Sequence, residues 1–267
     1  MRISTLLFKS IFILVCVLFF HTGYGQDTLK HTKTEVYKLR PSVDVPLVIG
    51  CAAWCAYAGT QIYSKGNSTQ AQILALNSNQ IDPLDRWAIR PYNHNVDRGS
   101  YYPFYAAFPL PLVVFLFGKN TRSDFMKLTF LYLEALSVTG LSGTSATYFV
   151  NQYRPYAYSA STDINEKMTQ NAKNSFYAGH VEIMAVSTFF AAKVCADYHP
   201  HSKVKWLFYT LAGAATAGMG YLRIDAGMHF PSDVLLGATT GAFAGILVPY
   251  FHSHRMVKNS SHSLSFN

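Results

Sequence analysis

Apolar stretches alternate with short polar segments along most of the chain. Most of these stretches approach the ~20 residues that a helix needs to cross a bilayer, although the fourth is short. Apolar runs of this kind predict an all-α, membrane-embedded bundle of about five to six apolar helices. The stretches cover residues 45–63, 103–118, 125–150, 183–192, 206–222 and 234–251.

Features inside these stretches predict how the helices pack. The prolines of 103–118 kink any helix there or delay its start. Gly237, Gly241 and Gly245 recur at every fourth position and allow another helix to approach closely, which places the last helix in the core. Glu134, in the middle of an apolar stretch, is expected to face the bundle interior and to have a partner there.

The N-terminal residues 1–25 have the pattern of a secretory signal peptide. Arg2 and Lys9 form a basic start, residues 10–20 are uncharged, and Gly23-Tyr24-Gly25 offers a small-x-small cleavage site. An uncleaved membrane anchor is the alternative. The remainder divides into a polar N-terminal segment (26–44), one helical bundle (45–251) and a polar tail (252–267).

The composition agrees with a membrane protein. Hydrophobic residues make up 50% of the chain and charged residues 13%, against roughly a quarter charged in soluble domains. The formal net charge is +8, but the basic residues form no long block, which argues against nucleic acid as a partner. Lipid headgroups or a phosphorylated substrate account better for the sign of the charge.

No disulfide framework, metal site or cofactor is predicted. The four cysteines form no C-x-x-C pair and have no zinc-type spacing with histidine. His252 and His254, close to the C-terminus, are expected to be solvated rather than to bind a metal.

Residues 64–102 form the longest polar connection. Within it, Asp82-Pro83 predicts a helix start with Pro83 at the first position, as suits a short amphipathic helix on the membrane surface. Asp225 and Glu182 lie close in sequence to the charged clusters described next, and we interpret both as structural residues or residues at the fringe of the substrate, not as catalytic ones.

A charged cluster precedes the last apolar stretch, where Arg223, His229 and Asp233 lie within eleven residues. Pro231 suits the first position of a helix, which puts Asp233 near N3 and His229 just before the helix. Free backbone N–H groups and the positive end of the helix dipole favour an anion at such a point. The pattern therefore predicts a phosphate site at a helix start.

Two more polar clusters, around Arg154 and His180, flank the loop between the third and fourth stretches. If consecutive helices are antiparallel, these clusters and the one before the last helix converge on one end of the bundle. Two guanidinium groups can clamp phosphate oxygens. One histidine can attack phosphorus and the other can protonate the leaving oxygen, so that no metal is required.

These residues resemble the signatures of the type 2 phosphatidic acid phosphatase and vanadium haloperoxidase superfamily. The motifs cover residues 147–233, and the helical layout extends the resemblance over roughly 45–251. In signature order, the matching residues are Arg154-Pro155, then 176–180 against P-S-G-H, then Arg223-x5-His229-x3-Asp233.

The resemblance implies a role for each residue. His229 would be the nucleophile that forms a phosphohistidine, Asp233 would orient it, and His180 would be the general acid that later activates water. Family members dephosphorylate lipid phosphates or pyrophosphates, and soluble relatives are acid phosphatases or vanadate-dependent haloperoxidases. The phosphate would be held by Arg154, Arg223, the Gly179 backbone N–H and Thr147.

The chain departs from the family pattern in the half that holds the phosphate. Thr147 stands where the family has a lysine, and Ala178 where it has the serine of the second signature. Removing one preorganised donor typically costs about 10²–10³ in rate. Lys167 and Lys173 are candidates to supply the missing charge. The other departures are Tyr177 for proline and Leu222 for serine.

The sequence thus predicts a metal-independent phosphatase that hydrolyses a lipid phosphate or pyrophosphate through a phosphohistidine. The alternative is a weakened or inactive family member that binds phospholipid or a protein partner. A haloperoxidase is disfavoured, because Thr147 weakens the cationic cradle that this chemistry needs.

Basic residues in alternate connections predict the orientation. They gather at 119–127, 203–205 and 255–258, which should share the cytoplasmic side. The site would then face the periplasm from a bacterial inner membrane. A cleaved signal peptide conflicts with this orientation if 45–63 crosses the membrane. Either that stretch does not cross, or the leader is processed differently, or the orientation rule fails here.

Overall fold

The computed structural model describes residues 35–253 of the 267-residue chain. The predicted signal peptide and residues 254–267 of the predicted tail lie outside these residues. The described part confirms the predicted all-α fold class. Its helices are α2 (Pro41–Tyr63), α3 (Gln70–Leu74), α4 (Pro83–Arg86), α5 (His94–Ala107), α6 (Leu110–Phe117), α7 (Lys119–Ser123), α8 (Phe125–Phe149), α9 (Ile164–Met168), α10 (Gly179–Tyr198), α11 (Val204–Asp225) and α12 (Pro231–Phe251), with 3₁₀ turns η1 (Ser78–Gln80), η2 (Pro155–Tyr158) and η3 (Gln170–Lys173).

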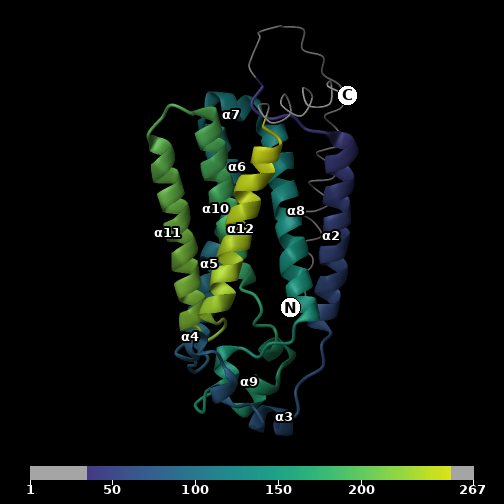
Figure 1. Ribbon diagram of the computed structural model, residues 1–267, viewed down its shortest axis with the longest axis vertical. Coiled ribbons are helices and arrows are strands. Elements are labelled where there is room, and N and C mark those ends of the chain that lie inside the picture. The colour runs from purple at the N-terminus through teal and green to yellow at the C-terminus, as the bar shows by residue number, and fades with distance from the viewer. Residues whose placement is uncertain (1–34, 254–267) are drawn as a thin grey trace, which may run out of the picture. The chain divides into compact units, whose positions relative to one another are not determined.

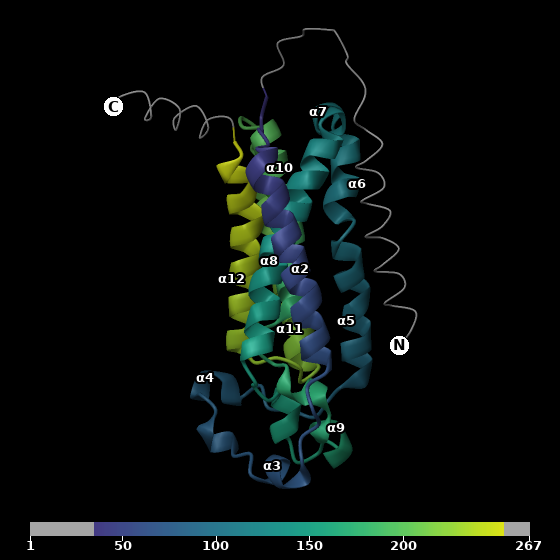
Figure 2. The ribbon, with the colours of Figure 1, turned by 90° about the vertical axis from the view of Figure 1, so that its right-hand side faces the viewer.

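The long helices run side by side, with α5 and α6 stacked end to end along one side (Figures 1 and 2). The short helices α3, α4 and α9 gather at the end where α10 and α12 begin, and α7 lies at the opposite end. The protein is a multi-pass membrane protein. Among residues 35–253, the segments long and apolar enough to cross a membrane are α2, His94–Phe117, α10 and α12.

Most of the long helices extend beyond the apolar stretches that predict them. The stretch 183–192 lies inside α10, which runs from Gly179 to Tyr198. The added turns are tolerated because their charges pair inside the bundle: Lys193 binds Asp197 one turn later, and the Tyr37 hydroxyl donates to Asp197 Oδ2 at 2.7 Å. The prolines of 103–118 break the helix at Pro109, between α5 and α6, in agreement with the sequence.

Helix starts follow the predicted signals. Pro231 is the first residue of α12, and the Asp233 carboxylate accepts the Phe230 N–H at 3.0 Å, which satisfies a donor that a helix start leaves free. Pro83 likewise begins α4, and the Asp82 carboxylate accepts the Leu84 N–H at 2.8 Å. These caps fix the point at which each helix leaves the loops.

A seam of glycines joins α12 to α10. A Cβ added to Gly237 would lie 2.7 Å from the Ala178 carbonyl oxygen, and one added to Gly241 would lie 2.3 Å from the Glu182 carbonyl oxygen. One turn further, a Cβ on Gly245 would lie 2.8 Å from the Val186 carbonyl oxygen. The two backbones therefore touch over three turns, as the glycine spacing predicts.

Replacing Gly241 with alanine is expected to destabilise the protein by about 1–3 kcal/mol or more, because the new methyl group meets backbone that cannot move aside. The midpoint of thermal unfolding in detergent measures the effect. Gly213→Ala in α11 is the matched control, since nothing lies within 4 Å of its added Cβ. Equal stability of the two variants would contradict the close contact of α10 with α12.

Glu134 faces the bundle interior and has a partner there, as predicted, because His252 Nε2 lies 3.5 Å from Glu134 Oε2. The expectation that His252 is solvated is wrong. His252 caps the end of α12, and its side chain turns inward, where 4% of it is exposed. His254 lies outside the described residues.

Candidate active site

His229 is buried in the turn between α11 and α12, with 3% of the residue exposed. Its Nδ1 lies 2.6 Å from the Ser175 carbonyl oxygen, and its Nε2 lies 3.3 Å from Arg154 Nη1. Because a guanidinium can only donate, Nε2 must be the acceptor, and the ring proton resides on Nδ1. The geometry thus selects the neutral tautomer in which Nδ1 carries the proton and Nε2 is unprotonated.

Arg154 is held by the two loops that border His229. Its Nε and Nη2 donate to the backbone and side chain of Asn171, at 2.8 and 3.1 Å. Its Nη1 donates to the Met228 carbonyl oxygen at 2.9 Å. The turn itself needs Gly227, whose φ is +72° and whose added Cβ would lie 3.0 Å from the Pro91 carbonyl oxygen. The guanidinium is therefore fixed beside the imidazole.

Arg223, at the end of α11, is the more buried of the two arginines, with 1% of the residue exposed. Its Nη1 donates to Asp97 Oδ1 and to the Ser100 hydroxyl, both at 2.6 Å and both from α5. Within the described residues its Nε has no hydrogen-bond partner. Arg223 is thus pinned through one nitrogen and keeps a donor unused.

Asp233 lies near His229 but does not form a hydrogen bond with it. Asp233 Oδ2 is 4.0 Å from His229 Nδ1, whereas it accepts the Ser175 hydroxyl at 2.6 Å. Gln152 Nε2 donates to the other carboxylate oxygen at 3.4 Å. Asp233 therefore holds Ser175, and Ser175 holds the imidazole. Orientation of His229 by Asp233, as the sequence predicts it, would act through Ser175.

His180 and Gly179 form the start of α10. The His180 ring lies against two α5 rings, with centroids 4.3 Å from Phe104 and 4.8 Å from Tyr101. Its Nε2 is buried and has no hydrogen-bond partner among the described residues. A Cβ added to Gly179 would meet nothing within 4 Å, so the backbone there borders open space. Both residues lie at the end of the bundle that also holds His229.

The Thr147 hydroxyl is engaged in hydrogen bonds to the backbone. Its hydroxyl donates to the carbonyl oxygens of Gly143 at 3.0 Å and Phe176 at 3.2 Å. A cation stands next to it: Lys65 Nζ donates to the Thr147 carbonyl oxygen at 2.6 Å and to Asn174 Oδ1 at 3.1 Å. Lys173, one of the predicted substitutes, donates instead to the Gly66 carbonyl oxygen at 2.5 Å.

Residues 128–256 match the family model described as the PAP2 superfamily. This match confirms, over slightly less than half of the chain, the resemblance drawn from the three signatures.

The PAP2 match is accompanied by similarity to individual proteins. The chain is 28% identical over 139 residues to the "Bacitracin transport permease protein BcrC" of Bacillus licheniformis, and the aligned part covers 52% of this chain and 62% of that protein. LpxE of Aquifex aeolicus is 23% identical, with 61% of this chain and 90% of that chain covered and a TM-score of 0.43. The PAP2 type phosphatidylglycerolphosphate phosphatase of Bacillus subtilis is 19% identical, with 78% and 94% covered and a TM-score of 0.46.

The PAP2 signatures do not mark several residues that build this site. Ser175 is the direct partner of His229, Asn171 holds Arg154, and Asp97 holds Arg223. Asp85 of α4 accepts both the N–H and the hydroxyl of Ser232 at the start of α12. Each contact joins segments far apart in the chain, so no local pattern announces it. Ser175 was the best placed, since it directly precedes the second signature.

The charges around His229 change the pKa of its imidazole. Burial lowers the pKa of His229 well below its ordinary value of about 6.5, and the nearby Arg154 and Arg223 lower it further. The folded protein thus keeps His229 neutral, whereas the unfolded chain takes up a proton below about pH 6.5. This contribution to stability is present above that pH and is lost progressively as the pH falls below it.

Replacing Arg154 with glutamine is expected to raise the pKa of His229, because the charge with the largest effect on the ring is removed. The acid limb of kcat/KM, which reports the free enzyme, should then move to higher pH, in addition to a lower overall rate. Arg122→Gln in α7, at the opposite end of the bundle, is the matched control. An acid limb that stays in place in Arg154→Gln would contradict this electrostatic coupling.

Proposed function

We propose that this protein is a metal-independent phosphatase that hydrolyses a lipid phosphate or pyrophosphate through a phosphohistidine. The observation that carries the proposal is the fixed pair of His229 and Arg154, with the unprotonated Nε2 accepting a hydrogen bond from a guanidinium nitrogen 3.3 Å away. An anion drawn to that guanidinium meets an unprotonated nucleophile. The match to the PAP2 superfamily supports the same chemistry.

Two buried polar atoms at this end of the bundle support an anionic ligand. Arg223 Nε and His180 Nε2 have no hydrogen-bond partner among residues 35–253, although buried polar groups are normally paired. A phosphate group would accept from Arg223, from Arg154 and from the N–H groups at the start of α10. Its charge would be balanced by the two guanidinium groups, without a bound metal in the reaction.

The proposed reaction has two steps. In the first, His229 Nε2 attacks phosphorus, the bond to the leaving oxygen breaks, and His180 gives that oxygen a proton. In the second, His180 takes a proton from water, the water oxygen attacks phosphorus, and the phosphorus–nitrogen bond breaks to release inorganic phosphate. The proton stays on His229 Nδ1, hydrogen-bonded to the Ser175 carbonyl oxygen, throughout both steps. The imidazole ring therefore carries a positive charge while Nε2 is phosphorylated.

The cation missing at Thr147 is replaced in part by Lys65 in this proposal. Lys65 Nζ donates to the Thr147 carbonyl oxygen, the Val150 carbonyl oxygen and Asn174 Oδ1, so its donors are used on the protein. It would contribute positive charge to the site rather than a direct phosphate contact. The Thr147 hydroxyl would have to leave its backbone acceptors in order to bind phosphate.

A lipid substrate suits the position of the site. His180 and His229 lie at or next to the first residues of α10 and α12, two of the candidate membrane spans, where a headgroup would sit with its tails along the bundle. The basic helix α7 and the lysines at 203–205 lie at the other end, which supports a periplasmic site in a bacterial inner membrane. The helix α2 is long and apolar enough to cross the membrane. This favours a leader that is processed differently over a stretch 45–63 that does not cross.

Phosphate release from purified protein tests the proposal. The panel contains a lipid monophosphate and a lipid pyrophosphate in mixed micelles, in buffer without added divalent cations. Release from either substrate supports the phosphatase. Absence of release from both, together with binding of vanadate or of phospholipid vesicles, would favour the alternative of a PAP2 protein that binds without catalysis.

A further inference from the structure

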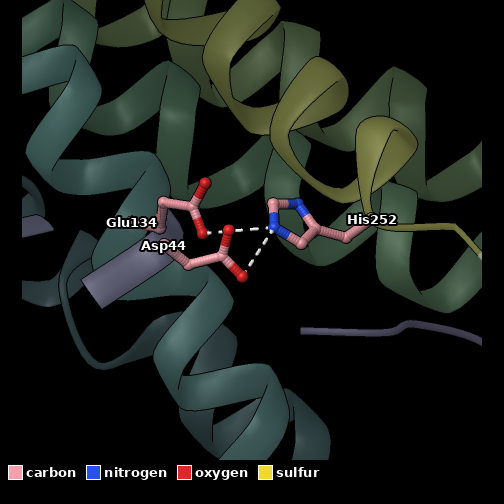
Figure 3. Close-up of side chains that lie close together, drawn as sticks. All are labelled: Asp44, Glu134 and His252. Carbon is pink, nitrogen blue, oxygen red and sulfur yellow. Dashed lines mark ion pairs between the residues drawn. The ribbon is translucent and has the colours of Figure 1, made fainter. Parts of the chain in front are cut away.

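Three ionisable side chains meet inside the bundle at the end away from His229. Asp44 comes from the first turn of α2, Glu134 from α8, and His252 from the cap of α12 (Figure 3). Figure 3 shows the His252 ring pointing between the two carboxylates. The proposed phosphatase chemistry uses none of these residues, and burial of at least one net negative charge needs a reason.

The distances are those of ligands around an ion rather than of hydrogen bonds. His252 Nε2 lies 3.3 Å from Asp44 Oδ2 and 3.5 Å from Glu134 Oε2, and the three ligand atoms all lie within 4.8 Å of one another. Tetrahedral Zn²⁺ binds nitrogen and oxygen at about 2.0–2.2 Å, which separates neighbouring ligand atoms by roughly 3.3–3.6 Å. Two of the three separations fall in that interval.

Unpaired atoms point into the centre of the cluster. Glu134 Oε2 and His252 Nε2 are buried and form no hydrogen bond within residues 35–253. Their side chains are 5% and 4% exposed, and that of Asp44 is 3% exposed. Two buried carboxylates and an unpaired ring nitrogen facing one another call for a cation between them.

The surrounding contacts orient the three groups as metal ligands. His252 Nδ1 donates to the Val248 carbonyl oxygen at 2.9 Å, which in the neutral ring leaves Nε2 with its electron pair toward the carboxylates. Asp44 Oδ2 accepts the Arg40 N–H at 2.5 Å. Metal-binding histidines and carboxylates are typically fixed by such outer contacts.

We propose that Asp44, Glu134 and His252 bind a divalent cation, with Zn²⁺ the best match and water as a fourth ligand. A divalent ion offsets both carboxylates when the imidazole is neutral, whereas a proton on His252 offsets only one of them. The site ties α2 to α8 and α12.

Metal analysis of the full chain purified in detergent tests the proposal. About one zinc ion per chain is expected after expression with zinc and removal of loosely bound metal. His252→Gln and Glu134→Gln should each weaken zinc binding by at least about 100-fold, since each removes a direct ligand. His201→Gln, an exposed histidine in the α10–α11 connection, should keep full occupancy.

Cobalt gives a second readout that does not depend on stability. Co²⁺ in place of Zn²⁺ should show the visible absorption of a tetrahedral site with nitrogen and oxygen ligands, and Asp44→Asn should abolish it. A chelator that strips the ion should lower the unfolding midpoint of the wild-type protein but not that of Glu134→Gln. Wild-type protein that binds neither ion, and whose stability a chelator leaves unchanged, would overturn the proposal in favour of a protonated His252 between the carboxylates. Neither readout involves phosphate release, so failure here leaves the phosphatase proposal standing.

Discussion

Phosphate release is expected to fall by about 10⁴–10⁶-fold when His229 is replaced by glutamine, because the variant lacks the group proposed to attack phosphorus. Glutamine keeps an amide that can donate to the Ser175 carbonyl oxygen, so the turn before α12 has a means to stay in place. The initial rate of release measures the loss. A phosphohistidine is stable in alkali, and an alkaline quench of wild-type protein should retain labelled phosphate that His229→Gln lacks.

The matched control for this experiment is His201→Gln, at an exposed position in the α10–α11 connection. It changes the same side chain far from the site and should release phosphate at the wild-type rate. If His229→Gln is folded and still releases phosphate or retains label, His229 is not the nucleophile.

The largest effect on stability is expected from Asp97→Asn, which leaves the Arg223 guanidinium buried without its carboxylate. Arg223 and Asp97 side chains are 1% and 12% exposed and lie 2.6 Å apart. Removing one partner of such a pair costs about 3–5 kcal/mol, because the remaining charge has lost its compensation away from water. Chemical unfolding in detergent micelles measures the change in free energy of unfolding.

An exposed ion pair of the same type provides the control. Arg90 and Asp225 lie 3.0 Å apart with side chains 29% and 35% exposed, and Asp225→Asn should cost no more than about 1 kcal/mol. The double variant Asp97→Asn/Arg223→Gln should recover part of the loss, since no buried charge then remains. Equal costs for the two single variants would show that burial of Arg223 does not set its dependence on Asp97.

Much of the fold follows from local signals in the sequence. Apolar runs mark the long helices, and a proline followed by a carboxylate marks the starts of α4 and α12. The full length of α10 was beyond such signals, because its charged turns are admitted only by partners such as Tyr37, which lies 160 residues from Asp197. Charged residues at which the sequence pattern ends a helix can therefore lie inside that helix when residues distant in the sequence pair with them.

The candidate site divides in the same way. The spacing of Arg223, His229 and Asp233 places them around the start of one helix. The sequence alone is therefore sufficient to find them. The residues that hold them, such as Asp97, are 126 positions from Arg223 and belong to a stretch without a motif. The wrong expectation for His252 has the same origin, since only the end of α12 against α2 and α8 brings it to Asp44 and Glu134.

The glycine contact between α10 and α12 has a consequence for how the protein would work through a catalytic cycle. Gly237, Gly241 and Gly245 meet carbonyl oxygens that also recur every four residues, so the two helices interlock like teeth. Sliding by one tooth would move α12 by about 6 Å along α10, which no small adjustment can achieve. His180 and His229, each carried at the start of one helix, therefore keep a constant separation. We expect the movements that admit substrate and release product to belong to the loops at this end of the bundle instead.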